Sequence, residues 1–159
     1  MLLSSPAPRI DWAGYEKSAP AVIAALRALG QAVDASGLDK RLTELVKVRA
    51  SQLNGCAFCL QFHLNAARRA GVPGPWLDLV AVWPEVAIYP ARERAALAWT
   101  EALTRMGEAP VEPAVYAALQ AEFSESEIAF LTAAIGNINA WNRIAGGLLF
   151  TPPIPKEAA

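Results

Sequence analysis

The sequence predicts an all-α protein. Apolar residues recur at spacings of three and four along most of the chain, alanine and leucine are abundant, and strand-like alternation is scarce. Start and stop signals for helices divide the chain into segments. A chain of 159 residues is long enough to bury a full core. We therefore expect one helical domain spanning residues 1–159.

Proline and glycine set the limits of the first two predicted helices. The first helix is expected over about 16–33, with Pro20 near its start and Gly37 closing the turn beyond it. The second is expected over about 39–53, stopped by Asn54-Gly55. One side of this second helix is apolar, and the other side is mixed: Glu44, Val48 and Ser51. Two such stripes indicate burial on both sides, which places Glu44 inside.

The third predicted helix carries the reactive side chains. It is expected over about 56–70, ended by Gly71 and followed by Pro73. One face of this helix carries reactive or small side chains and is expected to point inward: Cys59, His63, Ala66, Ala67 and Ala70. The alanines allow another helix to approach this stripe closely.

The rest of the chain reads as shorter helices followed by one long helix. A short helix near 76–80 precedes a loop over 83–89, and Pro90 suits the first position of a helix reaching about Thr104. After a loop over 105–111, Pro113 opens a helix that ends near Glu122. Ser124 and Glu127 form a capping-box pattern for a last helix over about 125–145, terminated by Gly146-Gly147. The proline-rich tail, 151–159, is expected to be irregular and to lie along a neighbouring subunit.

Composition excludes several classes of partner. The formal net charge is −1 and no block of like charges occurs, so neither nucleic acid nor an anionic membrane surface is an expected partner. No apolar run reaches the ~18 residues of a membrane span, and no targeting segment is visible, so we expect a cytoplasmic protein. Apolar residues make up 54% of the chain and charged residues 18%, against about 45–50% and about 25% in typical domains. The surplus apolar surface predicts a homo-oligomer.

Both cysteines and the single histidine lie within eight residues. On a helix, Cys56, Cys59 and His63 sit at i, i+3 and i+7 and project from one face. In a reducing compartment, a CxxC pair is more often catalytic or metal-binding than structural. The cluster therefore predicts a redox-active site.

The surroundings of the two thiols favour different roles for them. A thiol attacks as a thiolate, and the first turn of a helix favours negative charge, which singles out Cys56 as the thiol of lower pKa. His63 lies four residues after Cys59, within reach as a general base or proton shuttle. A carboxylate can orient such a base, and Glu44 is the candidate. If one sulfur is oxidised to a sulfenic acid, the other can condense with it to a reducible disulfide.

These residues resemble the core motif of the alkylhydroperoxidase D family, within the larger carboxymuconolactone decarboxylase-like superfamily. The motif reads Glu44, eleven residues, Cys56-x-x-Cys59, three residues and His63. Similarity extends to four flanking segments: 49–56, 67–71, 93–104 and 138–143. The resemblance covers about 10–150, with the motif segment at 44–70.

The resemblance implies an oligomerising, all-α alkylhydroperoxidase D-like fold and a thiol-peroxidase cycle. It implies that Cys59 attacks the hydroperoxide, that Cys56 resolves the sulfenic acid, and that Glu44 and His63 relay the proton. It also implies a dithiol, such as a lipoyl group, as electron donor. The decarboxylases of the superfamily do not rely on a CxxC pair, which argues against that activity here.

Other interpretations remain open at this point. The same CxxC pair suits a general thiol–disulfide oxidoreductase or a redox-sensing adaptor subunit without peroxide turnover. Together with Glu44 and His63 it offers four ligands to zinc, although this spacing differs from that of structural zinc sites, and we expect neither metal nor cofactor. Phe58 and Phe62 flank the reactive stripe. They could form an apolar entrance for an organic hydroperoxide, and core packing explains them equally well. Three amides of the last helix are expected to join helices, line a pocket or tie subunits together: Asn137, Asn139 and Asn142.

Overall fold

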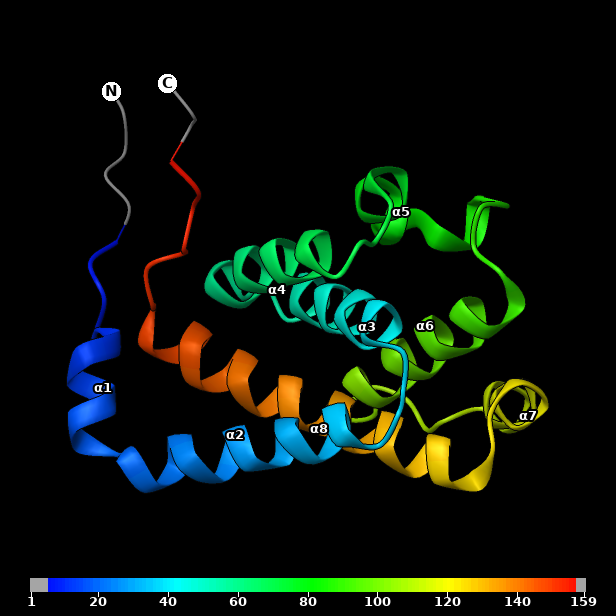
Figure 1. Ribbon diagram of the computed structural model, residues 1–159, viewed down its shortest axis with the longest axis horizontal. Coiled ribbons are helices and arrows are strands. Elements are labelled where there is room, and N and C mark those ends of the chain that lie inside the picture. The colour runs from blue at the N-terminus through cyan, green and yellow to red at the C-terminus, as the bar shows by residue number, and fades with distance from the viewer. Residues whose placement is uncertain (1–5, 157–159) are drawn as a thin grey trace.

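The computed structural model describes residues 6–156, and helices account for most of this part of the chain (Figure 1). Eight α-helices and one short 3₁₀ helix occur within it, and no strand does. In order they are α1 (Trp12–Ser18), α2 (Pro20–Ala35), α3 (Lys40–Leu53), α4 (Ala57–Arg69), α5 (Gly74–Leu79), η1 (Val80–Glu85), α6 (Ala91–Thr104), α7 (Pro113–Glu122) and α8 (Glu125–Leu148). The prediction of an all-α fold is confirmed.

Local capping explains why several helices begin where the sequence predicts. The Asp39 carboxylate accepts a hydrogen bond of 2.8 Å from the Arg41 backbone amide and so caps the start of α3. Ser124 and Glu127 form a reciprocal capping box that begins α8. Pro113 occupies the first position of α7, as expected.

The predicted first helix is in fact two helices, α1 and α2. They are separated at Ala19, which has φ −138° and ψ 51°. The residue before a proline is disfavoured in the helical region, so α1 ends at Ser18 and Pro20 starts a new helix. The prediction of one continuous helix over 16–33 was therefore wrong.

Two further boundaries also differ from the predictions. The loop expected over 83–89 begins inside η1, and Pro90 caps α6 instead of taking its first position. Gly146-Gly147 does not stop α8, whose last residue is Leu148. Leu149 caps the helix in the left-handed conformation, with φ +57°. A Cβ on Gly146 would lie 3.8 Å from the Cys56 Cβ. This is an ordinary van der Waals distance, and it shows that α8 passes beside the cysteine pair at Gly146.

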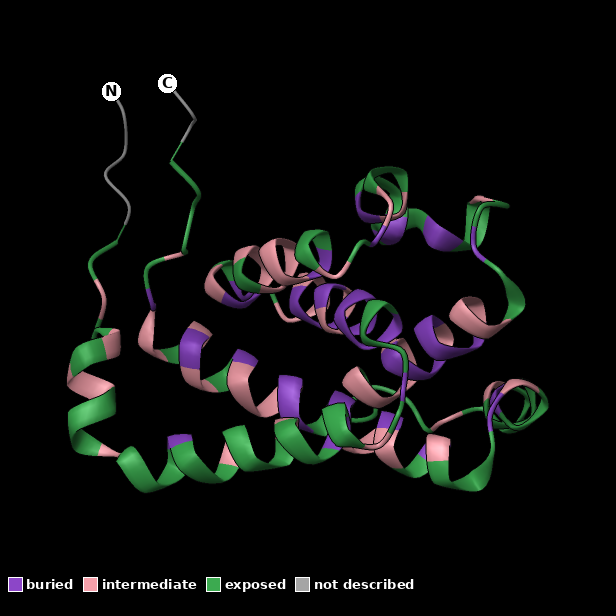
Figure 2. Cartoon of the chain, viewed as in Figure 1, coloured by how far each residue is buried: buried purple, intermediate pink, exposed green. Residues whose placement is uncertain are grey.

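Helix α3 lies at the centre of the molecule. It packs against α4, α6, α8 and η1, whereas α2 packs mainly on α8. In Figure 2, α3 is largely buried, while α2 exposes most of its length. The core side of α3 includes Leu45, Val46 and Val48, and Glu44 is buried beside them, as the two-stripe pattern predicts.

The chain leaves α8 at the end where α1 packs, and residues 151–156 are irregular, as predicted. The carbonyl oxygen of Pro153 accepts a hydrogen bond of 3.0 Å from Asn65 of α4. This part of the tail therefore contacts α4 of its own chain, while residues 157–159 lie outside the described part. None of the helices in residues 6–156 has the length and apolarity needed to cross a membrane.

Candidate active site

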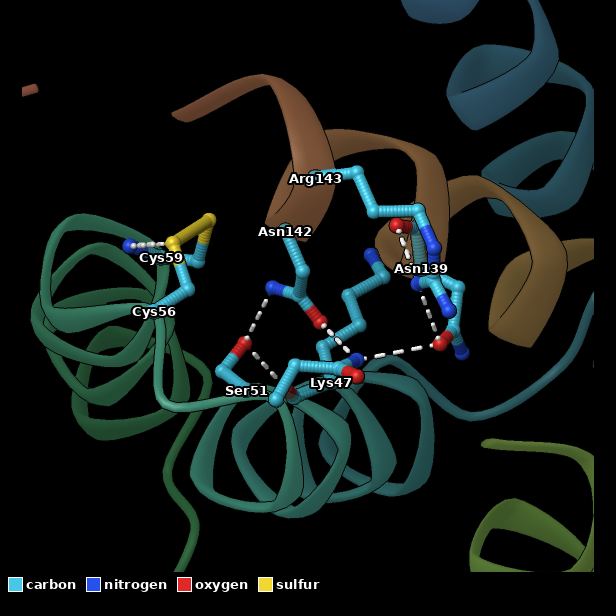
Figure 3. Close-up of a disulfide and its surroundings, with 8 residues drawn as sticks. Lys47, Ser51, Cys56, Cys59, Asn139, Asn142 and Arg143 are labelled. Carbon is cyan, nitrogen blue, oxygen red and sulfur yellow. Dashed lines mark hydrogen bonds between the residues drawn. A yellow bond between two sulfur atoms is a disulfide. The ribbon is translucent and has the colours of Figure 1, made fainter. Parts of the chain in front are cut away.

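The two cysteines lie at the start of α4 and form a disulfide (Figure 3). Their Cα atoms are 5.4 Å apart, and both residues are buried. Cys56 is the N-cap of α4, where its Sγ accepts the Cys59 amide at 3.3 Å. The positive Gly55 φ of 63° makes the turn that brings α3 into α4. The sequence thus places one sulfur at the helix terminus and the other one turn inside.

Packing of α4 on α3 brings His63 to Glu44. The His63 Nδ1 lies 2.7 Å from Glu44 Oε2. The other carboxylate oxygen, Oε1, is 3.0 Å from Lys47 Nζ and 3.1 Å from Lys40 Nζ. Only 3% of the Glu44 side chain is exposed, so these partners replace the water that the carboxylate has lost.

The charges around this pair keep Glu44 ionised and His63 neutral. Burial alone would raise the pKa of Glu44, but the hydrogen bond with His63 and the Lys47 ammonium hold it well below its usual range. Burial lowers the pKa of His63, the Glu44 carboxylate opposes this, and the nearby Lys47 and Lys40 ammonium groups add to the lowering, so the pKa lies below its usual value. An ionised carboxylate only accepts hydrogen bonds, so the His63 Nδ1 carries the proton. The Nε2 atom is then the basic nitrogen of the ring.

These shifts predict that the oxidised protein loses stability in acid. Because the folded pKa of His63 lies below the unfolded value of about 6.5, its contribution is complete above that pH and is lost as the pH falls. Glu44 acts in the same direction at lower pH. We expect the free energy of unfolding in urea to fall between pH 7 and pH 5, and to fall less in His63→Gln. Equal pH dependence in the two proteins would contradict the assignment of a neutral buried His63.

A cavity of about 520 Å³ opens beside the cysteine pair. Among its lining residues are Cys59 and His63 from α4 and Lys47 from α3. Aromatic side chains from three helices also line it, and α2 contributes several polar groups: Trp12, Phe58, Phe62, Trp141, Arg27, Gln31 and Asp34. Two members of the inward stripe predicted for α4, Cys59 and His63, therefore lie in the cavity wall, whereas Ala67 of the same stripe packs in the core.

The aromatic side chains around this cavity form a continuous cluster. Phe58 stacks on Trp12 and Phe62, with ring centroids 6.3 Å and 6.1 Å apart. Phe62 also meets the His63 ring edge to face at 5.1 Å. Phe58 also packs against the core cluster that contains both cysteines, whereas Phe62 is 46% exposed at the cavity.

Amides of α8 tie this helix to the end of α3 (Figure 3). Asn54 donates to Asn139 at 3.0 Å and to Asn142 at 2.8 Å, and Asn142 donates to Ser51 at 3.1 Å. Asn137 instead lines the cavity and donates to the Leu26 carbonyl of α2 at 3.1 Å. All three amides thus join helices, and Asn137 also belongs to the cavity wall.

Sequence reasoning missed the contribution of α2 and the position of Lys47. The polar residues of α2 recur at Arg27, Gln31 and Asp34, and this spacing of three and four was a usable signal. Nothing local marked Lys47, because it is one of two lysines near Glu44 in the sequence, the other being Lys40. Within residues 6–156 no group of three or more His, Cys, Asp or Glu side chains is arranged to hold a metal.

Comparison with known proteins finds one matching family model and one similar curated protein. Residues 20–102 match the model of the carboxymuconolactone decarboxylase family. The uncharacterized protein YdfG of Bacillus subtilis is 34% identical over 110 residues, which cover 69% of this chain and 75% of that protein.

Two crystal structures share the fold. One is a protein of unknown function from Agrobacterium tumefaciens, provisionally named antioxidant defence protein AhpD. It is 40% identical, with a TM-score of 0.88 over 94% of this chain and 100% of the other. The second is an uncharacterized peroxidase-related protein from Silicibacter sp. TM1040. It is 27% identical, with a TM-score of 0.71 over 80% of this chain and 68% of the other.

Proposed function

The chain belongs to the carboxymuconolactone decarboxylase family, and from this premise we propose that it is an AhpD-like, thiol-dependent peroxidase that reduces organic hydroperoxides. The observation that carries the proposal is the position of Cys59. This sulfur belongs to a pair that can form a disulfide, and it lines an apolar cavity together with His63. A hydroperoxide in the cavity would meet a nucleophile and a base from the same helix face.

In the proposed cycle, the His63 Nε2 takes the Cys59 thiol proton. The thiolate attacks the terminal oxygen of the hydroperoxide, so an S–O bond forms and the O–O bond breaks. The alkoxide that leaves takes the proton back from His63, and the product is an alcohol. Glu44 holds the imidazole in the required tautomer through the 2.7 Å hydrogen bond.

Cys56 then completes the oxidation. Its sulfur attacks the Cys59 sulfenic acid, the S–S bond forms, and hydroxide leaves and is protonated to water. The hydrogen bond from the Cys59 amide to the Cys56 Sγ, at the N-terminus of α4, favours the Cys56 thiolate for this step. Each sulfur would thus have a role suited to its position in α4. A dithiol, such as a lipoyl group, would reopen the disulfide in a reducing compartment.

The aromatic wall favours hydroperoxides with an apolar body over hydrogen peroxide. We expect Phe62→Ala to raise the KM for cumene hydroperoxide about 5- to 10-fold, because the substrate loses aromatic contact, and to leave the KM for hydrogen peroxide unchanged. Phe62 is 46% exposed, so its truncation disturbs little core. Tyr116→Ala is a matched control, since Tyr116 of α7 is 40% exposed and contacts the Trp99 ring at a tilted angle outside the cavity. Equal changes for both peroxides would contradict an apolar substrate site.

Steady-state turnover with dihydrolipoamide tests the proposal against the main alternative. A peroxidase oxidises this dithiol only when an organic hydroperoxide is present. A general thiol–disulfide oxidoreductase instead reduces a small disulfide quickly and leaves peroxide intact. Activity with the disulfide alone would replace the proposed function with that alternative.

The homo-oligomer expected from composition stays a proposal. Helix α2 is the element that best supports it, since apolar side chains such as Val22 and Leu29 are exposed along its outer side. Light scattering at several protein concentrations would measure the number of subunits.

A further inference from the structure

Lys47 is part of the cavity wall, although the cycle above gives it no step. It lies one turn after Glu44 in α3, and its Nζ is 3.0 Å from Glu44 Oε1. The second oxygen of the same carboxylate holds His63. Lys47 and His63 both line the cavity that Cys59 lines. One buried carboxylate therefore holds a base, His63, and a hydrogen-bond donor, Lys47, in the cavity wall beside Cys59.

The ammonium of Lys47 has donors to spare. It carries three N–H groups, and in residues 6–156 its side chain hydrogen-bonds only to Glu44. The side chain is 13% exposed, so water surrounds little of it. Charge–dipole and charge–charge interactions are stronger in such a site than in water. An oxygen atom held beside Cys59 would therefore gain more from this cation than from a solvent-exposed lysine.

Reduction of an alkyl hydroperoxide creates a need for such a cation. When the Cys59 thiolate bonds to the terminal oxygen, the O–O bond breaks and its electron pair stays on the leaving oxygen. The alkoxide that results is a strong base, and it is negatively charged until His63 returns the proton. Donors aimed at an oxygen where charge develops lower the barrier of such a step.

We propose that Lys47 is a catalytic residue that donates a hydrogen bond to the leaving oxygen as the O–O bond breaks. Its ammonium keeps its proton throughout, and His63 supplies the proton of the alcohol. This inference rests on the proposed peroxidase function, and it adds a group that recognises the leaving oxygen of the substrate.

Lys40 provides a matched comparison within the same protein. Its Nζ is 3.1 Å from the same Glu44 oxygen, and it also bonds Asp34 at 2.7 Å. Its side chain is 48% exposed, and the cavity lining includes Lys47 but not Lys40 among the described residues. Both lysines lower the pKa of His63, so loss of either changes the charge around Glu44 and His63. Only Lys47 is placed to touch the substrate.

The test varies the leaving group. Single-turnover loss of Cys59 thiol is measured with cumene hydroperoxide, which releases a basic alkoxide, and with perbenzoic acid, which releases a stable carboxylate. Lys47→Met is expected to slow the reaction with cumene hydroperoxide about 10- to 100-fold and the reaction with perbenzoic acid less than threefold. Lys40→Met is expected to change both rates by the same factor. Lys47→Arg is expected to recover part of the rate with cumene hydroperoxide, because it keeps a donor and a charge.

Each result has one meaning. Equal slowing of the two substrates by Lys47→Met would overturn the proposal and assign Lys47 to positioning Glu44. The same leaving-group dependence in Lys40→Met would also overturn it, because that lysine cannot touch the substrate. A thermal unfolding curve of each variant shows whether it is folded at the assay temperature. If the wild-type protein keeps its thiols with both peroxides, the proposed peroxidase function itself fails.

Discussion

Cys59→Ser is expected to reduce peroxide-dependent oxidation by on the order of 1,000-fold or more. A serine hydroxyl at this position is too weak a nucleophile to attack the hydroperoxide, even with His63 beside it. Cys56 remains as a thiol in this variant, but it is buried away from the cavity lining. The measurement is stopped-flow mixing of the reduced variant with cumene hydroperoxide, followed by a count of free thiols.

Cys56→Ser is the matched variant for the order of the two sulfurs. It is expected to react once at close to the wild-type rate and to stop at a Cys59 sulfenic acid, because no thiol remains to resolve it. Trapping with dimedone and mass spectrometry locates the adduct. A sulfenic acid on Cys56 in the Cys59→Ser variant, formed at the wild-type rate, would reverse the proposed roles.

Glu44→Gln is expected to have the second-largest effect, because it acts on both activity and stability. The amide no longer fixes the Nδ1–H tautomer of His63, and we expect oxidation of Cys59 to slow roughly 100- to 1,000-fold. It also leaves the Lys47 ammonium without its carboxylate partner in a poorly hydrated site. Breaking a buried ion pair in this way costs about 3 kcal/mol in the free energy of unfolding. Stopped-flow kinetics and urea unfolding measure the two effects separately.

Glu101→Gln is the control that separates catalysis from stability. The Glu101 carboxylate accepts hydrogen bonds from Arg49 at 2.7 Å and Trp83 at 2.8 Å, away from the cavity lining. Its loss is expected to lower the free energy of unfolding without slowing the oxidation of Cys59. If Glu44→Gln slows the reaction no more than Glu101→Gln does, the proton relay would have to be abandoned.

The reactive cluster was predictable from sequence because its geometry is local. Cys59 and His63 are one turn apart on a single helix, and capping by Cys56 follows from the Asn54-Gly55 break before it. The burial of Glu44 followed from the two stripes of α3. The pairing of Glu44 with His63 then needed only the packing of α3 on α4, which are consecutive helices.

Contacts between residues far apart in the sequence could not be predicted. The hydrogen bonds from Asn54 to Asn139 and Asn142 join residues 85 and 88 positions apart, and no local pattern determines such pairs. The cavity likewise needs α2 and α8 together with α4. Lys40 and Lys47 both lie within four residues of Glu44 in the sequence, but only Lys47 lines the cavity. Lys47 could therefore be recognised as part of the site only from the folded structure.

The most direct test of the account is the stoichiometry of a single reaction between the fully reduced wild-type protein and cumene hydroperoxide under anaerobic conditions. In the proposed cycle each chain consumes one hydroperoxide, releases one alcohol and loses two thiols, with the Cys56–Cys59 disulfide as the protein product. Survival of both thiols, or oxidation that stops at one modified cysteine without a disulfide, would contradict it.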